Sequence, residues 1–298
     1  KSILNRAPQL SYPNRTRDIV NTLSFKKYCS QNTDDSGTVK DAIMIFSDGL
    51  MRQTSDKSWE PIRSRRTFYE NCGEDDIKPN QQEPRIDPVL KVYRDCAVML
   101  MHNDCVASGR ANGTCATVEQ VVLKQGEKPF HVHLDDCKTD VHGAWASQVD
   151  KIRLRHCDGS IEPQVFELSS GEYKVTAKWP VPSSLYSYNQ QQRESIPMKV
   201  NQIPVVSNMA TTGHKLQGKT VHSFFVYAWN YVTNWPYVVL SRVRTMRGLF
   251  LHEKLSEDLS KYAVPEKLTA MLNKLRTVES DYPDIDFYHN VVHEEIAV

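Results

Sequence analysis

The sequence lacks several features that would assign a protein to a class at once. No apolar run approaches the ~20 residues that a membrane-spanning helix needs, so we expect no membrane partner. The seven cysteines, at positions 29, 72, 96, 105, 115, 137 and 157, form an odd set without a CxxC pair. This pattern argues against a secreted disulfide framework and favours reduced thiols inside a cell.

An excess of charge of one sign is also missing, because 37 basic residues are balanced by 36 acidic ones. The distribution of the charges is more informative than their sum. Residues 199–254 hold seven Lys and Arg residues and one acid, Glu253, whereas residues 255–298 hold nine acids and four bases. The basic block is therefore a candidate surface for a polyanion, and the acidic tail is typical of a solvated surface.

A chain of 298 residues that is 40% apolar can bury one large or two modest cores. Residues 10–28 read as a short strand, an N-cap and a helix with its apolar stripe at Ile19, Val20, Leu23 and Tyr28. Between residues 88 and 197, short β-rich runs alternate with turn residues, which indicates a small antiparallel barrel. These runs are 96–101, 117–123, 130–134 and 173–178.

The last third of the chain reads as an α/β sheet. Four apolar runs joined by short polar turns, at 203–206, 221–228, 237–240 and 249–251, are typical of buried strands. Two helices are expected near 253–262 and 265–278. We therefore expect an α/β domain, a parallel sheet with helices, interrupted by a β-barrel insert. The expected segments are 1–87, 88–200 and 201–298.

Residues 213–220 spell GxxxxGKT, the pattern of a nucleotide phosphate loop. Such a loop must leave a strand and enter a helix, whose first amides and dipole hold the phosphate. The following residues, 221–228, are β-branched and aromatic and favour a strand. An autonomous phosphate-loop ATPase built on this segment is thus an alternative that the local sequence disfavours.

The wider context of this segment fits another motif. Residues 208–220, NMATTGHKLQGKT, resemble motif V of Pif-type superfamily-one DNA helicases, A-T-x-H-K-x-Q-G-x-T. Residues 237–244, YVVLSRVR, followed by Gly248 and Leu249, resemble motif VI of the same family, Y-V-A-L-S-R-x-R with a following G-L. The two motifs occur in the family's order.

Two weaker blocks agree in order. Residues 92–103 with the Asn-Gly-Thr turn at 112–114 resemble the family's entry to its inserted barrel. Residues 12–21 are similar to the opening of the second RecA-like domain, where a tyrosine and a helix ending in I-N recur. The chain departs from the pattern at Gly213 and Val239, and residues 115–196 show no specific match. Nothing resembles the first motor domain, which we expect to precede this chain.

The resemblance implies the second RecA-like motor domain of an ATP-dependent DNA helicase, inactive without the first domain of the same polypeptide. It implies that Arg242 is a catalytic arginine finger and that Gln217, Gly218 and Thr220 lie near the nucleotide. Thr212, His214 and Lys215 are the implied strand contacts. The implied cofactors are ATP and Mg²⁺, bound mainly by the first domain. The implied partners are single-stranded DNA and duplex junctions, and the implied compartment is the nucleus or mitochondrion.

Two alternatives stay open. The chain could be a non-enzymatic remnant of a mobile-element helicase that keeps nucleic-acid binding. A second possibility is a metal site, because residues 131–142 include His131, His133, Asp135, Asp136, Cys137 and His142. Strand alternation places His131 and His133 on one face, as zinc would require. No second ligand pair follows at zinc-finger spacing, so we expect no metal.

Overall fold

The computed structural model describes residues 13–52, 56–64, 68–69, 77–79, 83–156, 164–180, 193–216, 218, 220–231, 235–264 and 266–279. The chain forms two compact units, Lys1–Thr211 and Thr212–Val298. In the described residues, no helix is both long enough and apolar enough to cross a membrane. The predicted segments 1–87, 88–200 and 201–298 stay a prediction, and strands from the first two share sheets.

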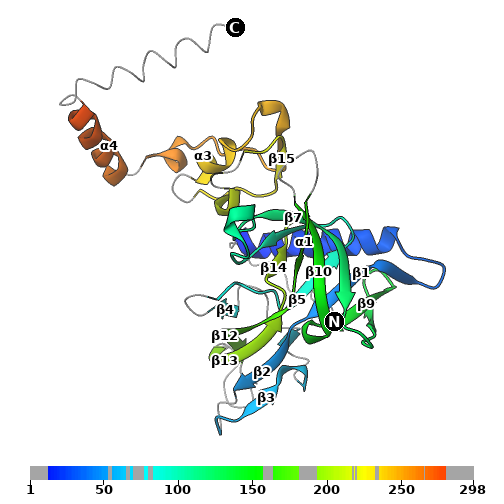
Figure 1. The fold of residues 1–298 in the computed structure, drawn as a ribbon. Coiled ribbons are helices and arrows are strands. Elements are labelled where there is room, and N and C mark those ends of the chain that lie inside the picture. Colours follow the sequence, from blue (N-terminus) through cyan, green and yellow to red (C-terminus); the bar gives the residue numbers. More distant parts are fainter. Residues whose placement is uncertain are drawn as a thin grey trace, which may run out of the picture. The chain divides into compact units, whose positions relative to one another are not determined.

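In the part of the first unit that the structure describes, the main elements are a long helix and three sheets (Figure 1). The strand orders are β5-β1-β9-β8, β11-β10-β7-β6-β14 and β3-β2-β13-β12-β4. The bounds are α1 Pro13–Gln31, β1 Thr38–Phe46, β2 Asp48–Arg52, β3 Trp59–Pro61, β4 Ile77–Pro79, β5 Val89–Tyr93, β6 Ala97–Leu100, β7 Cys115–Leu123, β8 Phe130–Leu134, β9 Thr139–Trp145, β10 Val149–His156, β11 Val165–Leu168, β12 Gly171–Pro180, β13 Arg193–Gln202 and β14 Val205–Ser207.

The main core lies between the first two of these sheets. The second half of strand β1, residues 42–46, is apolar on both faces because both faces are covered. Ile45 joins the core shared with the β6, β7 and β10 strands, whereas Ala42 and Met44 pack on the opposite side against α1. The layers are therefore helix, sheet and sheet.

Helix α1 packs through a different face from the one the sequence predicts. Phe25 and Cys29, one turn apart, are the buried residues that contact the sheet. Ile19 and Leu23 are 39% and 48% exposed, so the predicted apolar stripe is wrong for these two residues, whereas Tyr28 packs partly buried against the core. Asn21 explains the orientation, because it lies toward the buried side and hydrogen-bonds a distant segment of the chain.

A buried glutamine fixes the junction between β13 and β14. Gln202 is fully buried, and its Nε2 donates to the Asp87 carbonyl at 2.8 Å while its Oε1 accepts from the Ile203 amide at 2.9 Å. A buried amide is tolerated when its donors and acceptors are matched in this way. The positions of the backbone at Asp87 and at Ile203 therefore depend on this side chain.

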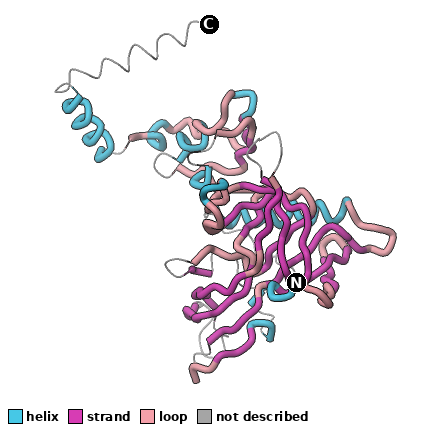
Figure 2. The backbone as a smooth tube through the Cα atoms, in the orientation of Figure 1, coloured by secondary structure: helices cyan, strands magenta, loops and turns pink. Residues whose placement is uncertain are grey.

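The barrel predicted at residues 88–200 is not confirmed. The expected runs do form strands β6, β7, β8 and β12. These strands are distributed over three open sheets, and the described strands form no closed barrel (Figure 2). Most strand pairs are antiparallel; among the described strands, parallel ladders join only β1 with β9 and β15 with β16. The fold is mixed α/β, with less parallel sheet than the sequence predicts.

The second unit is smaller. Its core is formed by Val226, Trp235 and Val239, with Phe224, Trp229 and Leu249 packed against them. Its described strands and α-helices are β15 Phe224–Val226, α3 Trp235–Leu240, β16 Leu249–Leu251 and α4 Glu266–Glu279. The predicted strand at 249–251 is thus confirmed, and the one predicted at 221–228 is confirmed for residues 224–226.

Residues 237–240 are helical, so the strand predicted there is wrong. Pro236 stands in the first turn of α3, where its missing N–H leaves no helical hydrogen bond unmade. The Ser241 amide then donates to the Tyr237 carbonyl at 2.9 Å. A four-residue apolar run cannot distinguish a strand from a buried helical turn, and the proline decides in favour of the helix.

Candidate functional site

The phosphate-loop-like segment begins with a single 3-10 turn, Gly213–Leu216. The Lys215 amide donates to the Thr212 carbonyl at 3.0 Å and closes the turn. Gly213 is buried against α3: a Cβ added to it would lie 2.6 Å from Nε1 of Trp235 and 2.9 Å from Cγ2 of Val239. Close packing therefore explains why this chain has glycine where the Pif-type pattern has an apolar residue.

The chain beyond this turn does not enter a helix. Gly218 takes the left-handed conformation with a φ of 78°, and strand β15 follows at Phe224. The prediction that a strand rather than a helix comes after Thr220 is confirmed. Without a helix start there is no row of free amides aligned with a helix dipole, which a phosphate loop requires.

Arg242 lies immediately after α3, and its guanidinium is held by neutral acceptors. Its Nε donates to the Val238 carbonyl at 3.1 Å, and its Nη2 donates to the Ser241 hydroxyl at 2.9 Å. The side chain is half-buried. Within the described residues, no carboxylate forms an ion pair with it. Its positive charge is therefore oriented but not neutralised.

Backbone hydrogen bonds bring the two helicase-like motifs side by side. The Val221 amide donates to the Arg242 carbonyl at 2.8 Å, and the Arg244 amide donates to the Val221 carbonyl at 3.2 Å. The parallel ladder of β15 and β16 continues this pairing, with Phe225 opposite Phe250. Thr220 therefore lies one residue from the backbone that carries Arg242.

Gly248 makes this pairing sterically possible. A Cβ at this position would lie 2.0 Å from the carbonyl oxygen of His222 and 3.0 Å from Cγ2 of Val243. Only glycine permits the two backbones to approach so closely. The glycine that follows the second motif in the sequence was the one signal that could have pointed to this contact.

The predicted site residues differ in how they are presented. Thr212 is 8% exposed, whereas Gly218 and Thr220 are exposed and Lys215 is half-buried. Gln217 lies outside the described residues, as does the side chain of His214. The predicted strand contacts and nucleotide contacts of these residues stay predictions.

The first unit holds the segment that leads into the turn. The Asn21 Nδ2 donates to the Ser207 carbonyl at 3.0 Å, and its Oδ1 accepts from the Ala210 amide at 2.6 Å. Strand β14 pairs with β6, and the Gly113 amide donates to the Leu100 carbonyl at 2.8 Å. Three of the sequence blocks that resemble the Pif-type pattern therefore contact one another within the first unit.

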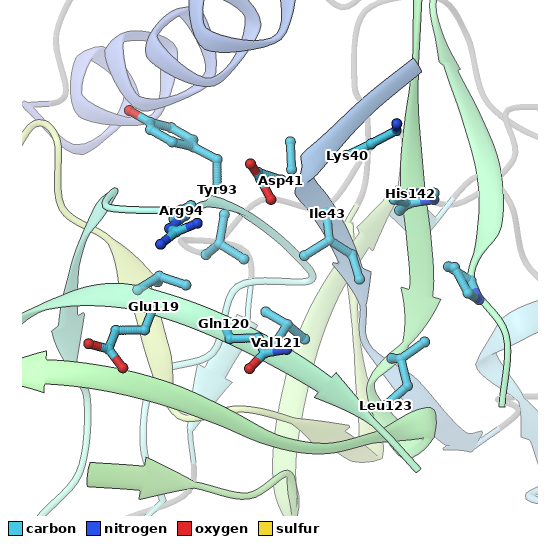
Figure 3. A pocket seen from close by; sticks show the side chains of 14 residues that line it. Lys40, Asp41, Ile43, Tyr93, Arg94, Glu119, Gln120, Val121, Leu123 and His142 are labelled. Atoms are coloured by element: carbon cyan, nitrogen blue, oxygen red, sulfur yellow. The ribbon is translucent and has the colours of Figure 1, made fainter. Parts of the chain in front are cut away.

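A cavity of about 260 Å³ opens between the first two sheets of this unit. Its inner wall is apolar, with Ile43, Val121 and Leu123, and its rim is polar (Figure 3). Lys40 and Arg94 on the rim are balanced by Asp41 and Glu119. A rim without net charge gives no preference for a phosphate group.

The candidate metal ligands between residues 131 and 142 lie in pairs rather than in one group. His131 is the cross-strand neighbour of His142, with ring centroids 5.8 Å apart, while Nδ1 of His133 lies 2.7 Å from Asp140. In the part of the chain that the structure describes, no three His, Cys, Asp or Glu residues are grouped to hold a metal. The proximity of His131 and burial lower the pKa of His142, burial having the larger effect.

The basic strand β10 is neutralised rather than free. Lys151 and Arg153 each lie 2.9 Å from Glu167, and Arg155 lies 2.7 Å from Asp95. These pairs explain the alternation of basic residues as a solvated sheet surface. Binding of nucleic acid through this strand is therefore not favoured.

Comparison with solved structures finds several similar chains. A Pif1 helicase from Candida albicans is 17% identical, with 91% of this chain and 51% of that chain covered and a TM-score of 0.48. A Bacteroides Pif1 helicase in complex with ADP-AlF3 and ssDNA is 18% identical, with 93% and 56% covered and a TM-score of 0.42. An unliganded Pif1 from Bacteroides sp is 17% identical, with 88% and 44% covered and a TM-score of 0.41.

These similar structures are Pif1 helicases. The chain spans roughly half the length of each of them. No family model matches the sequence, and no curated protein is significantly similar to it. A likeness of this size assigns no role to an individual residue.

Proposed function

We propose that this chain is the second motor domain of an ATP-dependent DNA helicase. One observation carries the proposal: the backbone pairing of Val221 with Arg242 and Arg244, which joins the two helicase-like motifs. A segment that contacts a nucleic-acid backbone and an arginine that reaches a nucleotide must be mechanically linked in a motor. This pairing is a short, rigid link of that kind.

Arg242 is the proposed arginine finger. Phosphoryl transfer develops negative charge on the leaving oxygens, and an arginine from a facing domain stabilises it. An arginine already paired with a carboxylate would be a poor donor for this purpose. Arg242 is instead oriented by a carbonyl and a hydroxyl, which leave its charge available.

In the proposal, ATP and Mg²⁺ are bound mainly by a first domain outside this chain. Residues 213–220 have the spelling of a phosphate loop but continue into a strand. The proposed first domain would hold the nucleotide and the metal, and closure of the two domains would bring Arg242 to the γ-phosphate. The cycle of closure would couple ATP hydrolysis to movement along a strand.

The strand contacts are testable on this chain alone. Binding to a short oligothymidylate should weaken for Lys215→Ala, and the slope of log K against log salt should fall by about one unit. Arg242→Ala should leave this affinity unchanged. Loss of strand affinity on removal of Arg242 alone would contradict the division of roles.

The nucleotide role is testable in the complete polypeptide that the proposal requires. There, Arg242→Ala should lower kcat for ATP by about 10³–10⁵, as for other arginine fingers. Arg242→Lys should not rescue it, because lysine lacks the planar fork of donors. Hydrolysis at the unchanged rate in Arg242→Ala would refute the proposal.

A further inference from the structure

The two-stranded sheet of the second unit has one face that the core does not use. Side chains alternate along β15 and β16, and Phe224, Val226 and Leu249 point toward the core. The intervening residues form the opposite face. We call this set, Phe225, Tyr227, Phe250 and His252, the aromatic face.

The four rings are arranged as a continuous surface. Phe225 and Phe250 are direct cross-strand partners. The His252 amide donates to the Val226 carbonyl at 2.9 Å and extends the ladder by one step. Tyr227 and His252 are stacked, with ring centroids 4.9 Å apart and planes within 2° of each other.

This face is open in the structure. Phe225 is 58% exposed, Phe250 54% and Tyr227 50%. Parallel sheets normally have both faces covered, and contiguous exposed apolar surface marks an interaction site. Phe224 packs against the core of the unit, whereas Phe225 and Tyr227 lie outside it.

The charges around the aromatic face are positive. Arg244 and Arg247 precede β16, and Lys254 follows it, all three exposed. In the described residues none of them is paired with a carboxylate. Glu253 is the only acidic residue between positions 212 and 254. Exposed cations therefore precede and follow the strand that carries Phe250.

We propose that the aromatic face binds single-stranded nucleic acid by stacking its unpaired bases, while Arg244, Arg247 and Lys254 contact the phosphates. Bases stack on aromatic side chains whatever their sequence, and cations along the edge hold the backbone. An acidic peptide would satisfy the cations but offers few flat rings for four aromatic side chains. The proposal rests on the proposed function for its choice of ligand, but it uses residues outside the turn at 213–216.

The test measures binding of a short oligothymidylate of about ten nucleotides to the full chain. Phe225→Ala and Phe250→Ala should each weaken binding by about 5–150-fold, the range for loss of one stacked base. Leu259→Ala, which removes an 80% exposed apolar side chain of the same unit outside this face, should leave the affinity unchanged. Phe225→Leu, which keeps an apolar side chain without a ring, serves if the alanine variant does not fold.

An abasic strand of the same length separates stacking from phosphate contacts. The aromatic variants should bind it as the unchanged chain does, whereas Lys215→Ala should weaken binding to both strands. Equal oligothymidylate affinity of the aromatic variants and the unchanged chain would overturn the stacking proposal and leave the proposed function standing. A dimer that dissociates in Phe225→Ala, with strand binding unaltered, would identify the face as a protein interface and overturn it as well.

Discussion

Substitution of Gly248 by alanine is the sharpest test of the pairing between the two motifs. The added Cβ would lie 2.0 Å from the His222 carbonyl oxygen, a backbone atom with no rotamer that could relieve the clash. Relief requires the strands to separate by about 1 Å, and overpacking of this kind costs about 1–3 kcal/mol. Gly248 does not have a positive φ, so alanine would otherwise stabilise by about 0.4–1 kcal/mol through the unfolded state. The clash exceeds this gain, and we expect a net loss of about 1–2 kcal/mol.

Hydrogen exchange measures this loss where it occurs. The amides of Val221, Arg244 and His252 are all donors in the pairing. Their exchange should accelerate roughly 5–30-fold in Gly248→Ala. Gly37→Ala is the control for backbone strain outside the pairing, because Gly37 belongs to the first unit, has a positive φ of 81° and would place an added Cβ more than 4 Å from any other atom. Unchanged or slower exchange of these three amides in Gly248→Ala would refute the pairing.

Three further predictions concern the first unit. Replacing Asn21 with leucine should lower the free energy of unfolding by about 1–3 kcal/mol in urea titrations, because two backbone groups lose their hydrogen-bond partner. An unchanged urea midpoint would contradict a stabilising role of the Asn21 hydrogen bonds. Gln202→Leu should cost about 2–4 kcal/mol by the same assay, since a buried amide and a buried carbonyl are left unpaired; a neutral result would show that water replaces the side chain. Hydrogen bonding from Ser108 lowers the pKa of Cys105, while burial raises the pKa of Cys29 to about 12. Iodoacetamide at pH 8 should therefore alkylate Cys105 in the folded chain and Cys29 only after unfolding. The alkylation rates of both cysteines should rise with pH. Equal labelling of the two cysteines in the folded chain would contradict their placement.

Strands with a clear alternation of side chains could be predicted from the sequence. Residues 130–134 form β8 with the expected bounds, and residues 117–123 lie within β7. Closure of the barrel could not be predicted, because it depends on register and strand stagger across the sheet rather than on local pattern. The same limit applies to α1, whose buried face is chosen by distant partners of Phe25 and Asn21.

The candidate site was predicted in part. The motif spellings pointed to Thr220 and Arg242, and the structure brings their backbones together through Val221. The contact of Trp235 with Gly213 was not predicted, because it depends on α3 being a helix. The exposure of Phe225 could not be predicted either, since alternation shows that a strand has two faces but not which one is covered.

The affinity of this chain for Mg-ATP tests the central claim most directly. The claim is that residues 213–220 belong to a motor domain that contacts a strand and reaches toward a nucleotide held elsewhere. Calorimetric titration of the 298-residue chain should give binding no tighter than about millimolar, and Lys219→Ala should not alter it. Micromolar binding that is lost in Lys219→Ala would show that the segment is itself a phosphate loop and would contradict the account.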